Sequence, residues 1–483
     1  AEALGSEQPP AIDPARIKYQ FLGIEYQCSF PGVHFFALVV QIARRRKSTR
    51  PPMHQIAENF NAQSLRTTSR QDGPGGGLRP EDSLPRVSGQ GLPATRLRIG
   101  VDARDLLIAE RTGVERMAFH FVERLHLFGD CDFVLFFDNE PPVDVAASMR
   151  HEVVVEPRRF GLLRKLFDTW TVIQLPRLLR RHRIDAFVSL NTKFPIGAGI
   201  PVCATVHGVE WFFYPEGYRL LERIKQRVWF ELCCRFSAGI ITFARNSQRD
   251  IQHIRPSCRA PICVVPEGCD PIFRRLTPDE IISDLAARHG LQAPYILSVC
   301  SLVPRKNIDS LLRAFAKLVK EHAVPHSLAL VGKSGWKADG LRALACQLGI
   351  SERVRFLGFV ADAELVQFYN QAVLFVYPSK YEGFGLPLLE AMSCGLPVVT
   401  SNRSATAEVA GEAAVLIDPF SVTDLAHGMK RALTDDALRA RLIHAGYERA
   451  AEHSWTEMVK GIREFILSRR LVSAGRTGEQ TPH

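Results

Sequence analysis

The stretch VLFVYPSKYEGFGLPLLEAMSCGLPVVT, residues 373–400, decides the fold class of this chain. It predicts a strand over 373–376, a loop with two glycines, a helix over 387–393 and a strand over 397–400. Pro387 stands where a helix takes its first residue, because the N–H that proline lacks is not needed there. A loop that leads from a strand into a helix aims backbone N–H groups and the positive helix end at an anion.

Strands and helices alternate on both sides of this corner, in two series with a seam between Pro271 and Pro294. Such alternation implies parallel sheets covered by helices on both faces. We therefore predict an α/β fold with two Rossmann-like domains, and a ligand cleft where strand carboxyl ends face the gap between them. The other predicted strands are at 97–104, 133–137, 153–155, 186–190, 202–206, 239–242, 295–299, 328–331 and 354–357, and the other predicted helices are at 113–128, 308–320 and 362–371.

The domain boundaries follow from composition and from these two series. Residues 71–95 are crowded with glycine, proline and polar residues, as in flexible linkers. The predicted divisions are a disordered or poorly structured extension over 1–95, a first Rossmann-like domain over 96–280, a second over 281–455, a carboxyl-terminal helix over 456–470, for which packing on the first domain is one arrangement, and a flexible tail over 471–483.

The chain has 483 residues and a formal net charge of +10, with a sequence pI near 9.1. Because 46% of its residues are hydrophobic and 23% are charged, wholesale disorder is excluded. The positive charge favours anionic partners, namely nucleic acid, acidic lipid headgroups or phosphorylated substrates, and does not choose among them.

The eleven cysteines contain no CxxC pair and fit no zinc-binding spacing, so we interpret them as reduced thiols of a cytoplasmic protein. The apolar run at 33–43 is about half the length that a bilayer requires, and its positive charges follow it. It is therefore predicted to be neither a transmembrane helix nor a cleavable leader, with a short interfacial anchor as the alternative.

Glu382 in the loop and Glu390 in the helix are eight residues apart. One carboxylate can project beside the loop while the other faces a ligand from the helix, which suits the hydroxyls of a sugar nucleotide. The alternative is that Glu390 only complements the helix dipole and that Glu382 is solvated.

Arg305 and Lys306 lie between a strand end and the helix that starts near residue 308. Cations at this position can neutralise a diphosphate as it leaves, and Asn307 can cap the helix. Two solvated surface cations are the alternative.

EGFGLPLLEAMSCGLPVVTS, residues 382–401, resembles the Glu-x7-Glu signature of family 4, the retaining nucleotide-sugar glycosyltransferases with two facing Rossmann-like domains, and in particular its mannosyltransferase-like group. YILSVCSLVPRKNIDSLLRAFAKL, residues 295–318, resembles the segment that begins the family's second domain. The resemblance covers 295–460 firmly and 97–290 more loosely.

The resemblance also marks positions in the first domain. Gly113 stands at the tight point of a loop that closes over the donor, His207 ends a strand at the cleft, and Ser247 lies near a helix start. Gly268 matches a donor-side glycine. This chain departs from the family pattern in having Gly208, Glu267 and Cys300-Ser301 where the family often has aspartate, asparagine and glycine-arginine, and the last departure leaves the diphosphate more dependent on Arg305 and Lys306.

The resemblance implies a retaining, metal-independent transfer of a mannose-like or glucose-like hexose from a nucleoside diphosphate sugar. The implied acceptor is a saccharide or lipid-linked saccharide, held by the first domain, in surface polysaccharide or lipopolysaccharide synthesis at the cytoplasmic membrane. Glu390 would bind ribose, Arg305 and Lys306 the diphosphate, and the amides of Phe384, Gly385 and Leu386 the phosphate and sugar. Glu382 would stand near the reacting sugar, and His207 would contact it from the opposite domain.

No cofactor is expected, because the sugar nucleotide is a substrate. Asp130-Cys131-Asp132 spells a metal-binding DxD motif of another glycosyltransferase fold. It falls between a predicted helix and a predicted strand, and the resemblance implies no bound metal, so we predict no metal site.

Residues 158–183 carry eight Lys or Arg among leucines and aromatics. This pattern suits peripheral contact with an anionic membrane, and the alternative is an ordinary helix that packs its apolar stripe inward. The alternative functions are an epimerase or phosphorylase of the same fold, and a non-catalytic nucleic-acid binder. The last is disfavoured because no fingerprint of cations and aromatics on a recognition element is present, so no nucleic-acid partner is expected.

Overall fold

The computed structural model describes residues 18–21, 24–27, 96–129, 131–148, 151–158, 168–333 and 338–468. The chain divides into two compact units, 1–95 and 96–483. In the first unit, strands β1 (Lys18–Phe21) and β2 (Ile24–Gln27) pair antiparallel. The sequence analysis did not predict this pair. The run at 33–43 and the tail at 471–483 lie outside the described residues.

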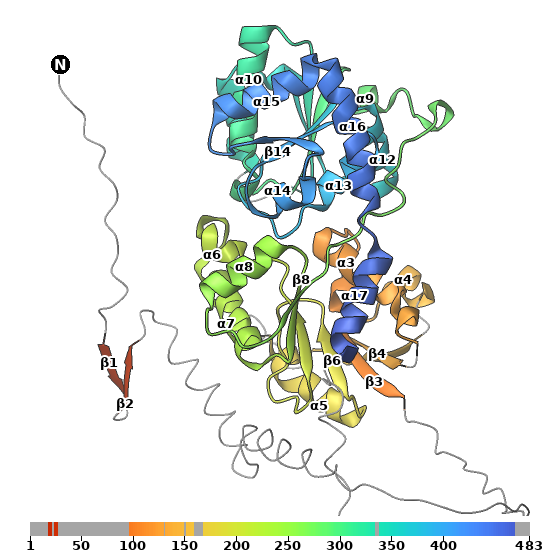
Figure 1. The fold of residues 1–483 in the computed structure, drawn as a ribbon, viewed down its shortest axis with the longest axis vertical. Coiled ribbons are helices and arrows are strands. Elements are labelled where there is room, and N and C mark those ends of the chain that lie inside the picture. Colours follow the sequence, from red (N-terminus) through yellow and green to blue (C-terminus); the bar gives the residue numbers. More distant parts are fainter. Residues whose placement is uncertain are drawn as a thin grey trace, which may run out of the picture. The chain divides into compact units, whose positions relative to one another are not determined.

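The second unit begins with a seven-stranded parallel sheet, which we call the first lobe together with its helices (Figure 1). Its strand order is β5-β4-β3-β6-β7-β8-β9, so the order reverses between β3 and β6. Figure 1 shows α7 and α8 to one side of this sheet and α3 to the other. The strands are β3 (Leu97–Asp102), β4 (Cys131–Phe137), β5 (Glu152–Val155), β6 (Ala186–Ser189), β7 (Val202–Thr205), β8 (Gly239–Thr242) and β9 (Ile262–Val264).

The helices of the first lobe follow the predicted alternation, except that the helix predicted over 113–128 ends as an α-helix at Glu123 and continues as a 3₁₀ turn. Its start is fixed by a capping box, in which the Thr112 N–H donates to the Glu115 carboxylate at 2.9 Å. The helices are η1 (Arg104–Leu107), α3 (Gly113–Glu123), η2 (Leu125–Phe128), α4 (Val143–Ser148), η4 (Trp170–Gln174), α5 (Leu175–Arg181), α6 (Glu210–Phe213), η5 (Pro215–Gly217), α7 (Leu220–Phe236) and α8 (Arg245–Ile254).

The second lobe is built on a six-stranded parallel sheet of order β12-β11-β10-β13-β14-β15. Two parallel sheets of this order confirm the predicted α/β fold with two Rossmann-like domains. The strands are β10 (Tyr295–Val299), β11 (Ser327–Val331), β12 (Val354–Gly358), β13 (Leu374–Tyr377), β14 (Val398–Ser401) and β15 (Ala414–Ile417), and the helices are η6 (Pro278–Glu280) and α9 (Leu285–Arg288) between the lobes, then η7 (Pro304–Lys306), α10 (Ile308–His322), α11 (Ala338–Gln347), η8 (Ser351–Arg353), α12 (Asp362–Gln371), α13 (Leu386–Ser393), α14 (Ser404–Ala410), α15 (Val422–Thr434), α16 (Asp436–Ala451) and α17 (Trp455–Ser468).

The core of the second lobe follows from its apolar pattern. All five residues of β10 are buried, as expected of a parallel strand covered on both faces. Helix α10 buries one face, because its apolar residues recur at helical spacing. These buried residues are Ile308, Leu311, Leu312, Ala314, Phe315, Ala316 and Leu318.

Helix α17 returns from the second lobe to the first, where it packs against α3 and η2. Trp455 stacks on His120 of α3, with ring centroids 4.5 Å apart. The Phe465 ring fills the place of a side chain at Gly239, since a Cβ there would lie 2.6 Å from it. In the part of the chain that the structure describes, no helix is both long and apolar enough to cross a membrane.

The apolar side chains of α5 and η4 point into the first lobe. Trp170, Leu175, Leu178 and Leu179 are all buried. For residues 168–183 the membrane prediction is therefore wrong and the inward-packing alternative is observed, because these side chains fill the core beneath β4 and β6. Residues 159–167 lie outside the described part of the chain.

Candidate functional site

The carboxyl ends of β10 and β13 meet where the strand order of the second lobe reverses, and three charged residues gather there. Arg305 donates to Glu382 Oε2 at 2.9 Å, and Lys306 Nζ donates to Glu382 Oε1 at 2.6 Å. Lys306 also donates to the Tyr377 hydroxyl at 2.6 Å. We call Arg305, Lys306 and Glu382 the charged triad. Open parallel sheets bind ligands at such a reversal point.

Burial and charge act in opposite directions within the triad. Burial alone would raise the pKa of Glu382, but the charges of Arg305 and Lys306 lower it to about 2. Burial lowers the pKa of Lys306, although the negative charge of Glu382 opposes this shift. Because Glu382 and Lys306 are only 6% and 8% exposed, the alternative of solvated side chains is wrong for both. Two cations around one carboxylate leave one positive charge for an anionic ligand.

Asn307 does not cap α10 as the sequence suggested. Its backbone is left-handed, with φ of 61°, and its side-chain amide instead donates to the carbonyls of Pro378 and Pro419 at 3.1 and 2.6 Å. The side chain therefore ties the loop after β13 to the loop after β15 and helps to hold the triad in place.

Glu390 is buried in α13 and its carboxylate is held from both lobes. Tyr369 of the second lobe donates to Oε2 at 2.8 Å, and Arg116 of α3 in the first lobe donates to Oε1 at 2.8 Å. Arg116 also bonds Asp362. Burial raises the pKa of Glu390, although Arg116 and Tyr369 oppose the shift. Glu390 is thus a polar contact between the lobes, and not merely a complement to the helix dipole.

Two glycines shape the loop before α13. Gly385 has φ of +120°, which residues with a side chain rarely adopt. A Cβ at Gly383 would lie 1.9 Å from the carbonyl oxygen of His207, so only glycine allows this loop to touch the first lobe. Ser247 of α8 donates to the Gly383 carbonyl at 3.1 Å. Gly113 faces Leu386, since a Cβ there would lie 3.8 Å from Leu386 Cδ1.

Gly113, Ser247 and His207 of the first lobe therefore lie against the loop that carries Glu382 and the start of α13. His207 follows β7, and its Nε2 donates to the Leu190 carbonyl at 2.9 Å. Its Nδ1 lies 3.8 Å from Glu267. Burial lowers the pKa of His207 and raises that of Glu267 to about 8. Burial therefore favours the uncharged form of both side chains, and neutral His207 carries its proton on Nε2, because the Leu190 carbonyl can only accept.

Comparison with known proteins identifies the family. Residues 111–273 match a family model described as Glycosyltransferase Family 4, and residues 285–449 match one described as Glycosyl transferases group 1. O-antigen chain mannosyltransferase B of Escherichia coli is 31% identical over 365 residues, which cover 74% of this chain and 92% of that protein. The chain belongs to the family 4 glycosyltransferases. This finding confirms the resemblance to the mannosyltransferase-like group.

Solved structures show the same fold as this glycosyltransferase. WaaG, a glycosyltransferase involved in lipopolysaccharide biosynthesis, matches with a TM-score of 0.60 at 19% identity, over 77% of this chain and 100% of that one. Anabaena Alr3699/HepE, in complex with UDP and glucose, matches with a TM-score of 0.61 at 22% identity, over the same shares. At these identities the likeness extends to the fold alone.

Gly268 and Phe384, which the sequence predicts to bind the sugar donor, also have packing roles. A Cβ at Gly268 would lie 2.1 Å from the Trp455 backbone nitrogen, so this glycine lets the start of α17 cross close by. Phe384 is buried, and its ring lies 5.8 Å from that of His453. Because the Phe384 side chain is buried, only the backbone of this residue can contact a ligand.

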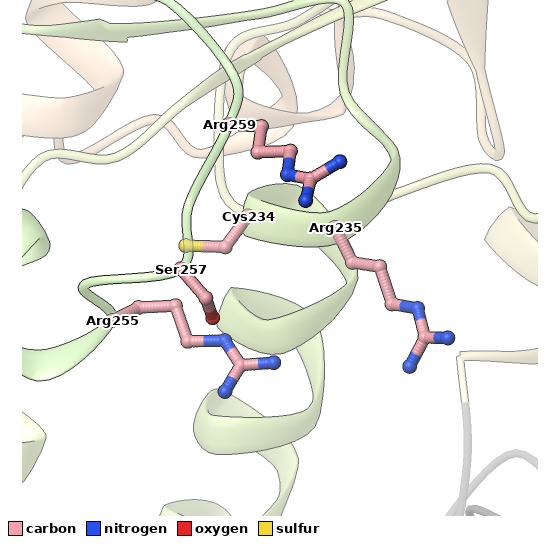
Figure 2. A pocket seen from close by; sticks show the side chains of 5 residues that line it. All are labelled: Cys234, Arg235, Arg255, Ser257 and Arg259. Carbon is pink, nitrogen blue, oxygen red and sulfur yellow. The ribbon is translucent and has the colours of Figure 1, made fainter. Parts of the chain in front are cut away.

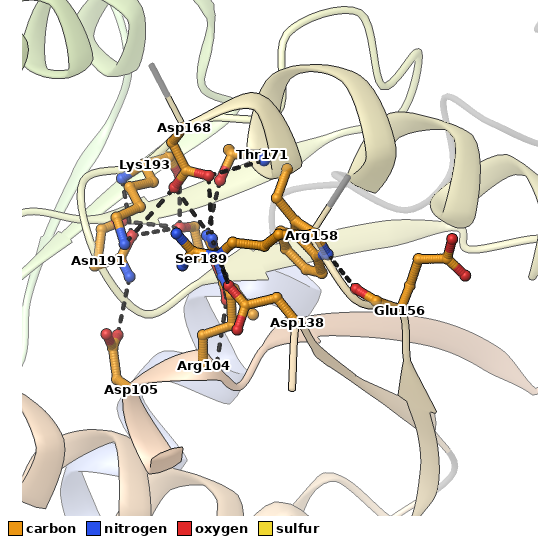
Figure 3. A network of polar contacts seen from close by, with 12 residues as sticks. Arg104, Asp105, Asp138, Glu156, Arg158, Asp168, Thr171, Ser189, Asn191 and Lys193 are labelled. Carbon is orange, nitrogen blue, oxygen red and sulfur yellow. Dashed lines mark hydrogen bonds and ion pairs between the residues drawn. The ribbon is translucent and has the colours of Figure 1, made fainter. Parts of the chain in front are cut away.

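A network of buried charges lies at the carboxyl ends of β3 and β4 (Figure 3). Arg104 donates to Asp102 at 2.7 and 2.8 Å, to Asp168 at 3.1 Å and to Thr171 at 2.7 Å. Asp138 lies 3.7 Å from the same guanidinium. Burial alone would raise the pKa of Asp168, but the charges of Arg104 and Lys193 lower it to about 2. The N–H groups of Arg104 donate to side chains of this network, so the network fixes the position of the segment before α3.

A pocket of about 350 Å³ lies elsewhere in the first lobe (Figure 2). Its lining residues precede β8 and β9, so it is at the amino edge of the sheet, opposite the charged triad. Arg235 lies in the last turn of α7, and Arg255 and Arg259 follow α8, so these cations complement the carboxyl ends of the helix dipoles. It is therefore not part of the candidate site. The lining residues are Cys234, Arg235, Arg255, Ser257 and Arg259.

Arg116 is a residue of the candidate site that the sequence analysis missed, since it contacts Glu390. It sits in the first turn of α3, where a cation is unfavourable toward the helix dipole. This unfavourable position of a cation was the signal available in the sequence, and only the structure shows that Arg116 contacts Glu390. In the described part of the glycosyltransferase, no group of three His, Cys, Asp or Glu side chains is arranged to hold a metal ion.

Proposed function

We propose that this glycosyltransferase transfers a hexose, mannose-like in first place and glucose-like in second, from a nucleoside diphosphate sugar to a saccharide or lipid-linked saccharide. The proposed acceptor belongs to O-antigen or lipopolysaccharide synthesis at the cytoplasmic face of the membrane. The similarity to an O-antigen chain mannosyltransferase along most of the chain supports the sugar and the pathway. The observation that carries the proposal is the charged triad, which lies at the reversal point of the second sheet and against the first lobe.

The donor nucleotide is assigned to the second lobe. The excess positive charge of Arg305 and Lys306 would hold the diphosphate, together with backbone N–H groups of Phe384, Gly385 and Leu386 at the start of α13. Glu390 would accept hydrogen bonds from ribose hydroxyls. Its Oε1 is engaged by Arg116, so ribose and Arg116 would share or exchange that oxygen.

The chemistry requires stabilisation of a leaving diphosphate and of a sugar with oxocarbenium character. Lys306, which is buried, and Arg305, which is partly buried, would stabilise the diphosphate charge as it develops, and this is most effective where water is excluded. Both oxygens of Glu382 are engaged by cations, and its pKa is about 2. We therefore assign Glu382 to orient the sugar and not to attack it, and propose that the acceptor attacks on the face that the diphosphate leaves, with retention of configuration.

His207 would meet the sugar from the first lobe. With Nε2 donating to Leu190, the lone pair of Nδ1 is the atom that can accept a hydroxyl proton. The direct contact of Gly383 with the His207 carbonyl leaves no room for a sugar between these two segments. The sugar would therefore lie beside this contact, which persists during transfer, and closure around the donor would exclude water.

The proposal is tested with a panel of UDP-, GDP- and ADP-sugars. Thermal shift identifies the nucleotide sugar that stabilises the full chain, and transfer is then followed with saccharide acceptors in the presence and absence of a chelator. We expect chelator-resistant transfer and an α-configured product by NMR. A β-configured product would refute retention. Interconversion of sugar nucleotides without an acceptor would instead support an epimerase.

A further inference from the structure

Cys234 and Cys258 lie together in the first lobe although they are 24 residues apart in the sequence. Cys234 is buried near the end of α7, and the half-buried Cys258 follows α8. Both pack in one apolar cluster, and the two thiols share a hydrogen bond. Figure 2 shows the Cys234 sulfur pointing toward the segment of Ser257, the residue before Cys258. The pair therefore meets the first requirement of a disulfide, which is that the two side chains face each other in contact.

The two thiols differ in acidity because their surroundings differ. The hydrogen bond from Cys234 lowers the pKa of Cys258 to about 7, although burial opposes this shift. The charge of Arg255 also lowers it, and Glu231, whose Oε2 lies 3.2 Å from Arg255 Nε, opposes that effect. The same hydrogen bond, together with burial, raises the pKa of Cys234. Near pH 7, Cys258 is therefore the sulfur that ionises, and Cys234 stays a thiol.

The arginine-lined pocket gives small molecules access to this pair. Cys234 is one of its lining residues, and Arg235, Arg255 and Arg259 are the cations among them. The pocket has a volume of about 350 Å³. Since roughly 15 Å³ is enough for one water molecule, hydrogen peroxide also fits. The three guanidinium groups favour an anionic sulfur over a neutral one.

Other described cysteines lack this combination. Burial raises the pKa of five of them, so they remain thiols at neutral pH and react slowly with oxidants. One of the five, Cys233, also donates to the Thr192 carbonyl at 3.1 Å. Oxidation is thus expected first at Cys258. The five are Cys203, Cys233, Cys269, Cys300 and Cys394.

We propose that Cys258 and Cys234 form a redox-sensitive pair, which a peroxide converts to a disulfide. The Cys258 thiolate attacks one oxygen of hydrogen peroxide, the O–O bond breaks, and the departing hydroxide takes up a proton to become water. The Cys234 sulfur then attacks the sulfenic acid on Cys258, the S–O bond breaks, and the oxygen leaves as water with the Cys234 proton. The two sulfurs together lose two electrons, and the peroxide gains them.

The disulfide would join the end of α7 to the segment after α8. The amino end of α8 contacts the second lobe, where Ser247 donates to the Gly383 carbonyl at 3.1 Å and Glu408 accepts the Arg245 N–H at 2.8 Å. Oxidation would thus fix the far end of a helix that contacts the loop of the charged triad. Transient disulfides in reducing compartments are typical of redox sensing. The proposal does not rest on the proposed function.

The experiment treats the reduced full chain with hydrogen peroxide, blocks the remaining thiols with N-ethylmaleimide, and analyses its peptides by mass spectrometry without reductant. We expect a peptide pair that is joined through Cys234 and Cys258 and that dithiothreitol separates. The rate at which this link forms should rise with pH around a midpoint near 7, as the Cys258 thiol ionises.

Two variants separate the roles of the two sulfurs. Cys234→Ala should lose the link and should leave a sulfenic acid on Cys258 that dimedone labels, because the second thiol is missing. Cys258→Ser should lose both the link and the label.

The matched controls remove a neighbouring buried thiol and an exposed one. Cys233→Ala and Cys346→Ser should form the link like the parent chain. A parent chain in which Cys258 stays reduced would overturn the proposal. So would a link that persists in Cys234→Ala, or one that requires Cys233 instead.

Discussion

Replacement of Glu267 by Gln should change how the stability of this glycosyltransferase depends on pH. Glu267 is buried beside His207, and burial raises its pKa from 4.5 to about 8. In the unfolded chain the carboxyl ionises near its ordinary pKa. Glutamine has nearly the same shape and cannot ionise, so it removes this one titration and leaves the rest of the fold in place.

The direction follows from the raised pKa. Below pH 4.5 the carboxyl is protonated in both states and costs nothing. As the pH rises toward 8, the unfolded chain loses the proton while the folded chain keeps it, and folding loses about 1.4 kcal/mol for each pH unit. At pH 7 the loss is about 3 kcal/mol, and above pH 8 it levels off.

The assay is thermal unfolding of the parent chain and of Glu267→Gln at pH 5, 7 and 9. The two melting temperatures should be close at pH 5, and the variant should be more stable by several degrees at pH 7 and 9. Asparagine, which is frequent in the family at this position, should act in the same direction. A difference in melting temperature between the two chains that does not change from pH 5 to pH 9 would refute the argument, since Glu267 would then have the same pKa in the folded and unfolded chains.

Three further predictions concern the contacts around the triad. Lys306→Met should lower turnover on the order of a hundredfold in a transfer assay, because one buried cation near the leaving diphosphate is lost; unchanged turnover would remove Lys306 from the site. Arg116→Met should tighten nucleoside diphosphate binding in calorimetry by about tenfold, because a charged hydrogen bond that competes with ribose for Glu390 disappears; weaker binding would show that Arg116 contacts the nucleotide instead. Gly383→Ala should abolish transfer while nucleotide binding persists, because a Cβ at Gly383 would collide with the first lobe, whereas Gly340→Ala, with no atom near its Cβ position, should be silent; equal activity of both variants would contradict the close contact between Gly383 and the His207 carbonyl.

Much of the second lobe was predictable because its signals are local. The alternation of apolar strands with helices of period 3.6 gave β10, β13 and β14 and their order along the chain. The short strands β9 and β15 were missed, because three or four apolar residues without a flanking pattern do not distinguish a strand from a loop.

The site was predictable only in part. Arg305 and Lys306 were placed near Glu382, since loops that follow neighbouring parallel strands emerge at one edge of the sheet. The sequence could not show that Glu382 is held by both cations, that Asn307 bonds two loop carbonyls, or that Arg116 reaches Glu390 from 274 residues away. The apolar residues of 168–183 were also ambiguous, because amphipathic spacing is the same on a core-facing helix and on a membrane-facing one.

The sequence by itself determined the two Rossmann-like units, the corner at 382–390 and the family, because these depend on the local spacing of apolar residues, glycines and charges. Only the tertiary structure decided which charges pair, which side chains are buried, and that Cys234 and Cys258 lie in contact. Pairing and burial depend on segments that are distant in sequence and meet only when the lobes fold, and the same residues acquire shifted pKa values only when that meeting removes them from water.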